Sequence, residues 1–141
     1  NRELGVSMAE FPVTLEAARA AWEQGMHVAF GAPNILRGGS ATGNLSAREA
    51  IAAGYGDVIC SDYAPMAMIH AALALMRHNR LPLPQAVRML SANPSRAAGI
   101  DHLTGAIAPG KAADLVLLDP TDPHPRVVKT LVAGREVYAC A

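Results

Sequence analysis

The chain has 141 residues, of which 51% are hydrophobic and only 17% charged, and its 12 basic and 12 acidic residues cancel. This composition fits a globular unit with a core and excludes a disordered chain. The balanced charge offers no general attraction for nucleic acid or for an anionic membrane. The most apolar segment, residues 64–76, is shorter than the about 20 residues that span a bilayer. We therefore expect neither a nucleic-acid partner nor a membrane partner.

The two cysteines, Cys60 and Cys140, lie far apart and lack the spacing of a metal site, which is typical of a protein from the reducing cytoplasm. The chain begins at Asn1 rather than at a methionine, and a strand-like segment follows within a few residues. We therefore expect a cytoplasmic protein of which this chain is a piece.

The first part of the chain predicts strands that alternate with helices. Short apolar segments predict strands over residues 4–11, 27–31 and 58–60. Amphipathic segments predict helices over residues 15–24, 47–53, 65–79 and 84–91. Thr14 predicts the first N-cap, and Ser46 with Glu49 predicts a capping box for the second helix. Asn93-Pro94 is expected to break the last helix. This rhythm predicts βα units around a parallel sheet.

The pattern of the sequence changes after Gly99, where no further helix-like segment occurs. Short β-like segments follow, separated by glycine and proline: residues 105–108, 113–118, 127–133 and 136–138. This tail predicts a small all-β unit. We therefore expect two units, over residues 1–100 and 101–141.

Asp62 is the first candidate functional residue. It follows the apolar run 58–60, which suits a strand buried on both faces, and Pro65 opens the next helix. Asp62 would thus lie where a buried parallel strand ends, which is the edge that carries the chemistry in α/β barrels and open sheets. A turn or capping aspartate is the alternative.

The loop over residues 34–44 is the phosphate-like feature of the chain. Gly38 and Gly39 allow backbone amides to approach an anion, and Arg37 supplies a forked donor for phosphate oxygens. The other substrate-binding candidates are Asn34, Ser40 and Tyr63. A mobile loop without a ligand has the same glycines, and Tyr63 beside Asp62 is as often a packing residue.

Two longer motifs carry a resemblance. Residues 92–100 (ANPSRAAGI) and 105–119 (GAIAPGKAADLVLLD) resemble the C-terminal signature of the amidohydrolase superfamily. There the chain leaves a (β/α)₈ barrel and joins a β-sandwich that both chain ends build. The resemblance implies an α/β fold, a partial TIM barrel of about the last three βα units followed by a small sandwich portion.

Further segments resemble one family within this superfamily, over residues 9–18 (AEFPVTLEAA), 31–40 (GAPNILRGGS) and 61–65 (SDYAP). Enzymes of that family serve the carbon–phosphorus lyase pathway and hydrolyse the 5-triphosphate of α-D-ribose 1-methylphosphonate, releasing diphosphate. The resemblance implies a small phosphorylated substrate and a divalent metal ion, with zinc ahead of manganese, iron and magnesium. A homo-oligomer is compatible with it.

The resemblance also implies roles for two carboxylates. The superfamily's acid at the end of barrel strand eight binds the metal and takes a proton from the attacking water, which assigns both roles to Asp62. Glu10 ends the first strand, where many members place a metal-binding histidine, so it is the second candidate ligand; a structural glutamate is the alternative. The superfamily's His-x-His pair does not occur in this chain. We therefore expect most of the metal site to require a longer protein.

Two other functions remain open at this point. A relative that hydrolyses C–N bonds, such as a deaminase or a cyclic amidase, would share the same C-terminal signature. A non-catalytic piece that serves as an interaction or structural module is the other alternative, and the isolated chain is expected to be inactive.

Overall fold

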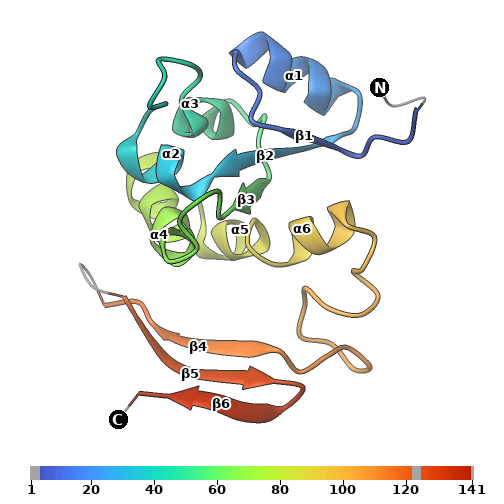
Figure 1. Ribbon diagram of the computed structural model, residues 1–141, viewed down its shortest axis with the longest axis vertical. Helices are drawn as coiled ribbons and strands as arrows, with labels where there is room; N and C mark the ends of the chain where they lie inside the picture. The colour runs from blue at the N-terminus through green and yellow to red at the C-terminus, as the bar shows by residue number, and fades with distance from the viewer. Residues whose placement is uncertain (1–3, 122–124, 141) are drawn as a thin grey trace.

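The computed structural model describes residues 4–121 and 125–140. The first part of the chain forms a parallel sheet with the order β1–β2–β3 (Figure 1), built from β1 (Met8–Glu10), β2 (His27–Gly31) and β3 (Val58–Cys60). The predicted parallel sheet is confirmed, although β1 is shorter than the segment predicted over residues 4–11. All three strands run in the same direction, so their carboxyl ends meet at one edge.

Helices surround this sheet: α1 (Leu15–Glu23), α2 (Ala32–Arg37), α3 (Ala47–Ala52), α4 (Ala67–Asn79), α5 (Leu83–Arg88) and α6 (Ala92–Ala97). Helix α1 packs against β1 and β2, and α4 packs against α2 and β3. After His27, the central strand β2 is apolar and covered on both faces, so that Val28, Ala29 and Phe30 are all buried. None of the described helices has the length and apolarity needed to cross a bilayer.

The last part of the chain forms an antiparallel sheet from β4 (Leu115–Asp119), β5 (Arg126–Val132) and β6 (Arg135–Ala139). Figure 1 shows this sheet apart from the parallel one, on the far side of α4, α5 and α6. Side chains of β6 are exposed throughout. The change from an α/β part to a β part, which the sequence predicted, therefore occurs between α6 and β4.

Several predicted elements were wrong in detail. Helix α2 was not predicted, yet Pro33 occupies its first turn and Gly38 ends it in the left-handed conformation. Helix α5 ends at Arg88, before Asn93 and Pro94, and these two residues lie in the first turn of α6, where a proline is tolerated. No strand forms over residues 105–108. The helix predicted from residue 65 begins at Ala67 as α4, and Met66 before it is exposed.

The two predicted N-caps had different outcomes. The Thr14 hydroxyl accepts a hydrogen bond from the Ala17 amide at 3.2 Å, which confirms the cap of α1. The capping box of α3 was wrong: Ser46 precedes the helix, but its hydroxyl donates to the Gly38 carbonyl at 3.2 Å. Ser46 thereby ties the loop after α2 to the start of α3.

Candidate active site at the carboxyl ends of the parallel strands

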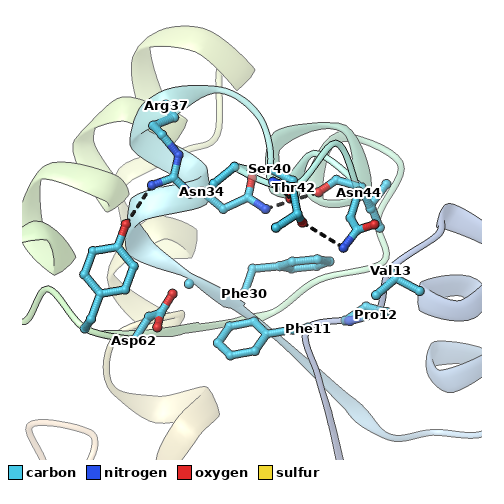
Figure 2. A pocket seen from close by; sticks show the side chains of 14 residues that line it. Phe11, Pro12, Val13, Phe30, Asn34, Arg37, Ser40, Thr42, Asn44 and Asp62 are labelled. Atoms are coloured by element: carbon cyan, nitrogen blue, oxygen red, sulfur yellow. Dashed lines mark hydrogen bonds between the residues drawn. The ribbon is translucent and has the colours of Figure 1, made fainter.

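An open cavity of about 250 Å³ lies at the edge where the parallel strands end (Figure 2). Residues after all three strands contribute to it, as expected for the functional edge of a parallel sheet. Its lining includes the predicted site residues Asn34, Arg37, Ser40, Asp62 and Tyr63. The predicted Glu10, Gly38 and Gly39 are not among the lining residues. The structure thus brings together side chains from residues 11 to 63.

Asp62 lies two residues after β3 with a positive φ of 52°, a conformation that side chains other than glycine rarely adopt. A Cβ atom on Gly31 would lie 3.1 Å from Asp62 Oδ2 and 3.3 Å from Phe11 Cε1. The Gly31 φ of −70° is ordinary, so this glycine is required by space and not by backbone conformation. Because Gly31 has no side chain, the Asp62 carboxylate and the Phe11 ring can both lie against the end of β2.

Phe11 has the same unusual backbone as Asp62, with a φ of 54° directly after β1. Such residues persist only where the surrounding structure holds them, and they cluster at functional sites. Sequence reasoning missed Phe11, because the side chain next to it, Glu10, drew attention as a carboxylate. The available signal was its position one residue beyond a predicted strand end.

Arg37 and Tyr63 stand together on the polar side of the cavity. Arg37 ends α2 and Tyr63 follows Asp62, and the guanidinium Nη1 donates to the phenol oxygen at 2.8 Å (Figure 2). A second polar group comes from one loop: the Ser40 and Thr42 hydroxyls lie 3.0 Å apart, and Asn44 Nδ2 donates to Thr42 Oγ1 at 2.9 Å. The wall thus presents a cation and several neutral donors.

Asn34 lines the cavity, but its amide is committed to the loop. Nδ2 donates to the Leu45 carbonyl at 3.1 Å, and Oδ1 accepts from the Ala47 amide at 3.0 Å. Arg48 adds a bond from Nε to the Ile35 carbonyl at 2.6 Å. The Asn34 side chain therefore joins α2 to the end of the loop over residues 38–46 and to the start of α3.

The opposite wall is apolar and was not predicted from the sequence. It consists of Phe11, Pro12, Val13, Phe30 and Leu45. Loops after β1 and before α3 supply most of it, and Figure 2 shows the Phe11 and Phe30 rings below the side chains of Arg37, Ser40, Thr42 and Asn44. The cavity therefore has one anion-attracting side and one side suited to an apolar or weakly polar group.

The described residues do not form a metal site by themselves. No group of three or more His, Cys, Asp or Glu side chains within residues 4–121 and 125–140 is arranged to hold an ion. Among the lining residues Asp62 contributes a carboxylate. Burial raises the pKa of the nearby Cys60 thiol, and the charges of Glu10 and Asp62 act in the same direction, against a hydrogen bond from the Asp62 backbone. A raised thiol pKa disfavours the thiolate that metals bind.

His27 lies at the other end of β2, as predicted for a residue that begins a strand. Its Nδ1 is 2.6 Å from Asp57 Oδ2, and Asp57 Oδ1 accepts from the Val28 amide at 2.9 Å. Asn93 Nδ2 donates to the Asp57 carbonyl at 2.8 Å. These bonds tie the starts of two strands to α6, so His27 and Asp57 have a structural place away from the cavity.

Comparisons with known proteins agree with this architecture. The sequence model of the amidohydrolase family matches residues 11–138. The α-D-ribose 1-methylphosphonate 5-triphosphate diphosphatase of Escherichia coli is 41% identical over 140 residues, which is 98% of this chain and 37% of that protein. An imidazolonepropionase of Picrophilus torridus is 38% identical over 68 residues, covering 45% of this chain and 17% of that protein. This chain thus spans well under half the length of these relatives.

Solved structures show the same fold at lower identity. An enamidase of the amidohydrolase superfamily superposes with a TM-score of 0.70 at 15% identity, over 94% of this chain and 40% of that one. The N-acetylglucosamine-6-phosphate deacetylase of Pasteurella multocida gives a TM-score of 0.60 at 16% identity, over 90% of this chain and 48% of that one. Since the family model covers nearly the whole chain and the fold agrees, this chain belongs to the amidohydrolase family.

Proposed function

We propose that this chain is the C-terminal part of a longer hydrolase that cleaves α-D-ribose 1-methylphosphonate 5-triphosphate to the 5-phosphate and diphosphate. The observation that carries the proposal is that a carboxylate, Asp62, and a guanidinium, Arg37, line one cavity at the carboxyl ends of parallel strands. The similarity to the Escherichia coli diphosphatase, over 98% of this chain, supports this substrate. In this proposal the parallel sheet is the last portion of a barrel and β4–β6 part of a sandwich.

The residues of the cavity have distinct roles in this reaction. Water attacks a phosphorus of the triphosphate, a new P–O bond forms, and the P–O bond to the departing diphosphate breaks. Asp62 accepts the proton of the water, which is the work of a general base. Arg37 faces the charged phosphate oxygens, and the Ser40 hydroxyl adds a neutral donor. The Gly38 amide is not available for this role, because it donates to the Asn34 carbonyl at 3.0 Å at the end of α2. The apolar wall takes the weakly polar part of the substrate.

Divalent ions are general in this family. Such an ion supplies a Lewis acid for the water and the phosphoryl oxygens. The described residues offer it the Asp62 carboxylate and, beside the cavity, Glu10; we propose that its other ligands come from parts of the longer protein outside this chain. Zinc is the first candidate, before manganese, iron and magnesium.

The test is Asp62→Asn in the longer protein. The amide keeps the shape of the carboxylate but neither accepts the proton as readily nor brings a negative charge, so kcat should fall about 100- to 10,000-fold, the range of general-base catalysis. Bound metal should fall as well. Asp101→Asn makes the same chemical change in the exposed segment between α6 and β4 and should leave kcat unchanged.

The assay should offer the triphosphate and, in parallel, an amino-substituted heterocycle as a deaminase substrate and a cyclic amide. Near-normal triphosphate hydrolysis by the Asp62→Asn protein would overturn the role of Asp62. Hydrolysis of the C–N substrates in place of the triphosphate would overturn the proposed reaction and favour the deaminase or cyclic amidase class.

A further inference from the structure

Arg37 and Tyr63 are joined although they come from different strand exits. Arg37 belongs to the helix after β2, Tyr63 to the segment after β3, and Nη1 of Arg37 donates to the Tyr63 oxygen at 2.8 Å. The neighbouring polar side chains have other partners: Asn34 joins α2 to Leu45 and to the start of α3, and Asn44 bonds to Thr42 within one loop. Only the Arg37–Tyr63 bond, among these, joins the segment after β2 to the segment after β3.

The direction of this hydrogen bond leaves donors free on both partners. A guanidinium has five N–H groups, so one bond to Tyr63 leaves others for a ligand. A phenol that accepts from a cation must point its own O–H elsewhere, and hydrogen bonds in a chain polarise one another. Tyr63 is 72% exposed, so its ring adds little to the core and its hydroxyl is reachable.

We infer that Arg37 and Tyr63 act as one unit that binds a single phosphoryl group, with Tyr63 both donating to a phosphate oxygen and positioning the guanidinium. This inference rests on the proposed function and deepens it, because it assigns one phosphoryl group of the 5-triphosphate to one pair of side chains. The opposite apolar wall, with Phe11 and Val13, then faces the other end of the substrate. A long arginine side chain is otherwise mobile at this exposed site, so a fixed acceptor lowers the entropy lost on binding.

The experiment is a double-mutant cycle in the longer protein with Arg37→Ala, Tyr63→Phe and both together. The measured quantities are the Kd of inorganic tripolyphosphate and the kcat and KM of the ribose triphosphate. Tyr63→Phe should weaken tripolyphosphate binding about 10- to 150-fold, the effect of one lost hydrogen bond to a charged group. In the Arg37→Ala background the same change should cost only about twofold, because a coupled pair is not additive. KM should carry the loss while kcat stays near normal, since Asp62 is untouched.

Tyr138→Phe is the matched control, because it removes the same hydroxyl on β6, away from the cavity, and it should change neither constant. A Tyr63→Phe protein that binds tripolyphosphate as tightly as the Tyr138→Phe protein would overturn the inference. Equal Tyr63→Phe losses with and without Arg37 would overturn the coupling of the pair. Unchanged tripolyphosphate binding and kcat/KM in the Arg37→Ala protein would instead show that the polar side of the cavity does not bind phosphate. That result would overturn the proposed function as well.

Discussion

At the scale of single residues, the site depends on a missing side chain. Gly31 ends the central strand with ordinary backbone angles, and both Asp62 and Phe11 lie against the space where its Cβ would be. Asp62 and Phe11 are also the residues held with positive φ at the ends of the two outer strands. The position of the proposed base is thus set by contacts from all three strands, and a small change at Gly31 should reach it directly.

Gly31→Ala in the longer protein tests this dependence. Alanine adopts the Gly31 backbone conformation without strain, but its Cβ would press on Asp62 Oδ2 from 3.1 Å. The carboxylate must shift by a few tenths of an ångström, so kcat should fall about three- to tenfold, scaled from the about 100-fold cost of a 1 Å misplacement. Tripolyphosphate binding at Arg37 should be retained, which serves as the internal control. A normal kcat would show that Gly31 does not position the base.

At the scale of elements, hydrogen bonds to the Asp119 carboxylate connect the end of β4 to the start of β5 in the antiparallel sheet. Asp119 ends β4 and accepts from the Thr121 hydroxyl and from the Thr121 amide at 3.0 Å, and Arg126 Nη2 at the start of β5 lies 3.2 Å from its other oxygen. These bonds lower the pKa of Asp119 from its ordinary value of 3.8, and the hydrogen bond from the Thr121 hydroxyl has the largest effect. A lowered pKa means that the folded state favours the ionised carboxylate.

The pH dependence follows from that sign. The contribution of Asp119 to stability is present above its ordinary pKa of 3.8 and is lost as pH falls through the lower folded-state value. In thermal melts of the longer protein, Asp119→Asn should lower Tm at pH 6, and the difference from the unchanged protein should shrink toward pH 3. Asp101→Asn removes a carboxyl outside this turn and should not reproduce the pattern. A Tm difference that is constant from pH 6 to pH 3 would contradict the claim that the ionised Asp119 carboxylate stabilises the fold.

At the scale of the whole molecule, both sheets leave surface without a partner in the described part of the chain. The outer strands β1 and β3 pair on one side only. Large apolar side chains are also exposed on the antiparallel sheet: Val116, Leu117, Val132, Val137 and Tyr138. Unpaired edges and exposed apolar patches promote association between chains.

We therefore expect the isolated 141-residue chain to self-associate. Light scattering after size-exclusion chromatography should give a mass above that of one chain and rising with concentration, with binding of a hydrophobic dye. The longer protein under the same conditions is the control and should bind less dye. A monomeric isolated chain with a sharp, cooperative melt would show that these surfaces need no further cover.

Much of the element order was already determined by the sequence. The strands over residues 27–31 and 58–60 were predicted with their observed bounds, because strands buried on both faces have continuous apolar runs. The Thr14 cap was predictable because its bond to Ala17 is local. The placement of Asp62, Arg37 and Tyr63 at one edge followed from the rule that parallel strands end together.

Only the tertiary structure decided how the site is assembled. Phe11, Gly31 and Asp62 meet because β2 lies between β1 and β3, an order that no local pattern specifies. The Arg37–Tyr63 bond joins residues 26 positions apart. It depends on the length of α2, whose residues from Asn34 onward the sequence predicts as part of a loop. Periodicity reports which face of an element is buried, whereas contacts between separate elements arise only when their packing brings them to within a few ångströms.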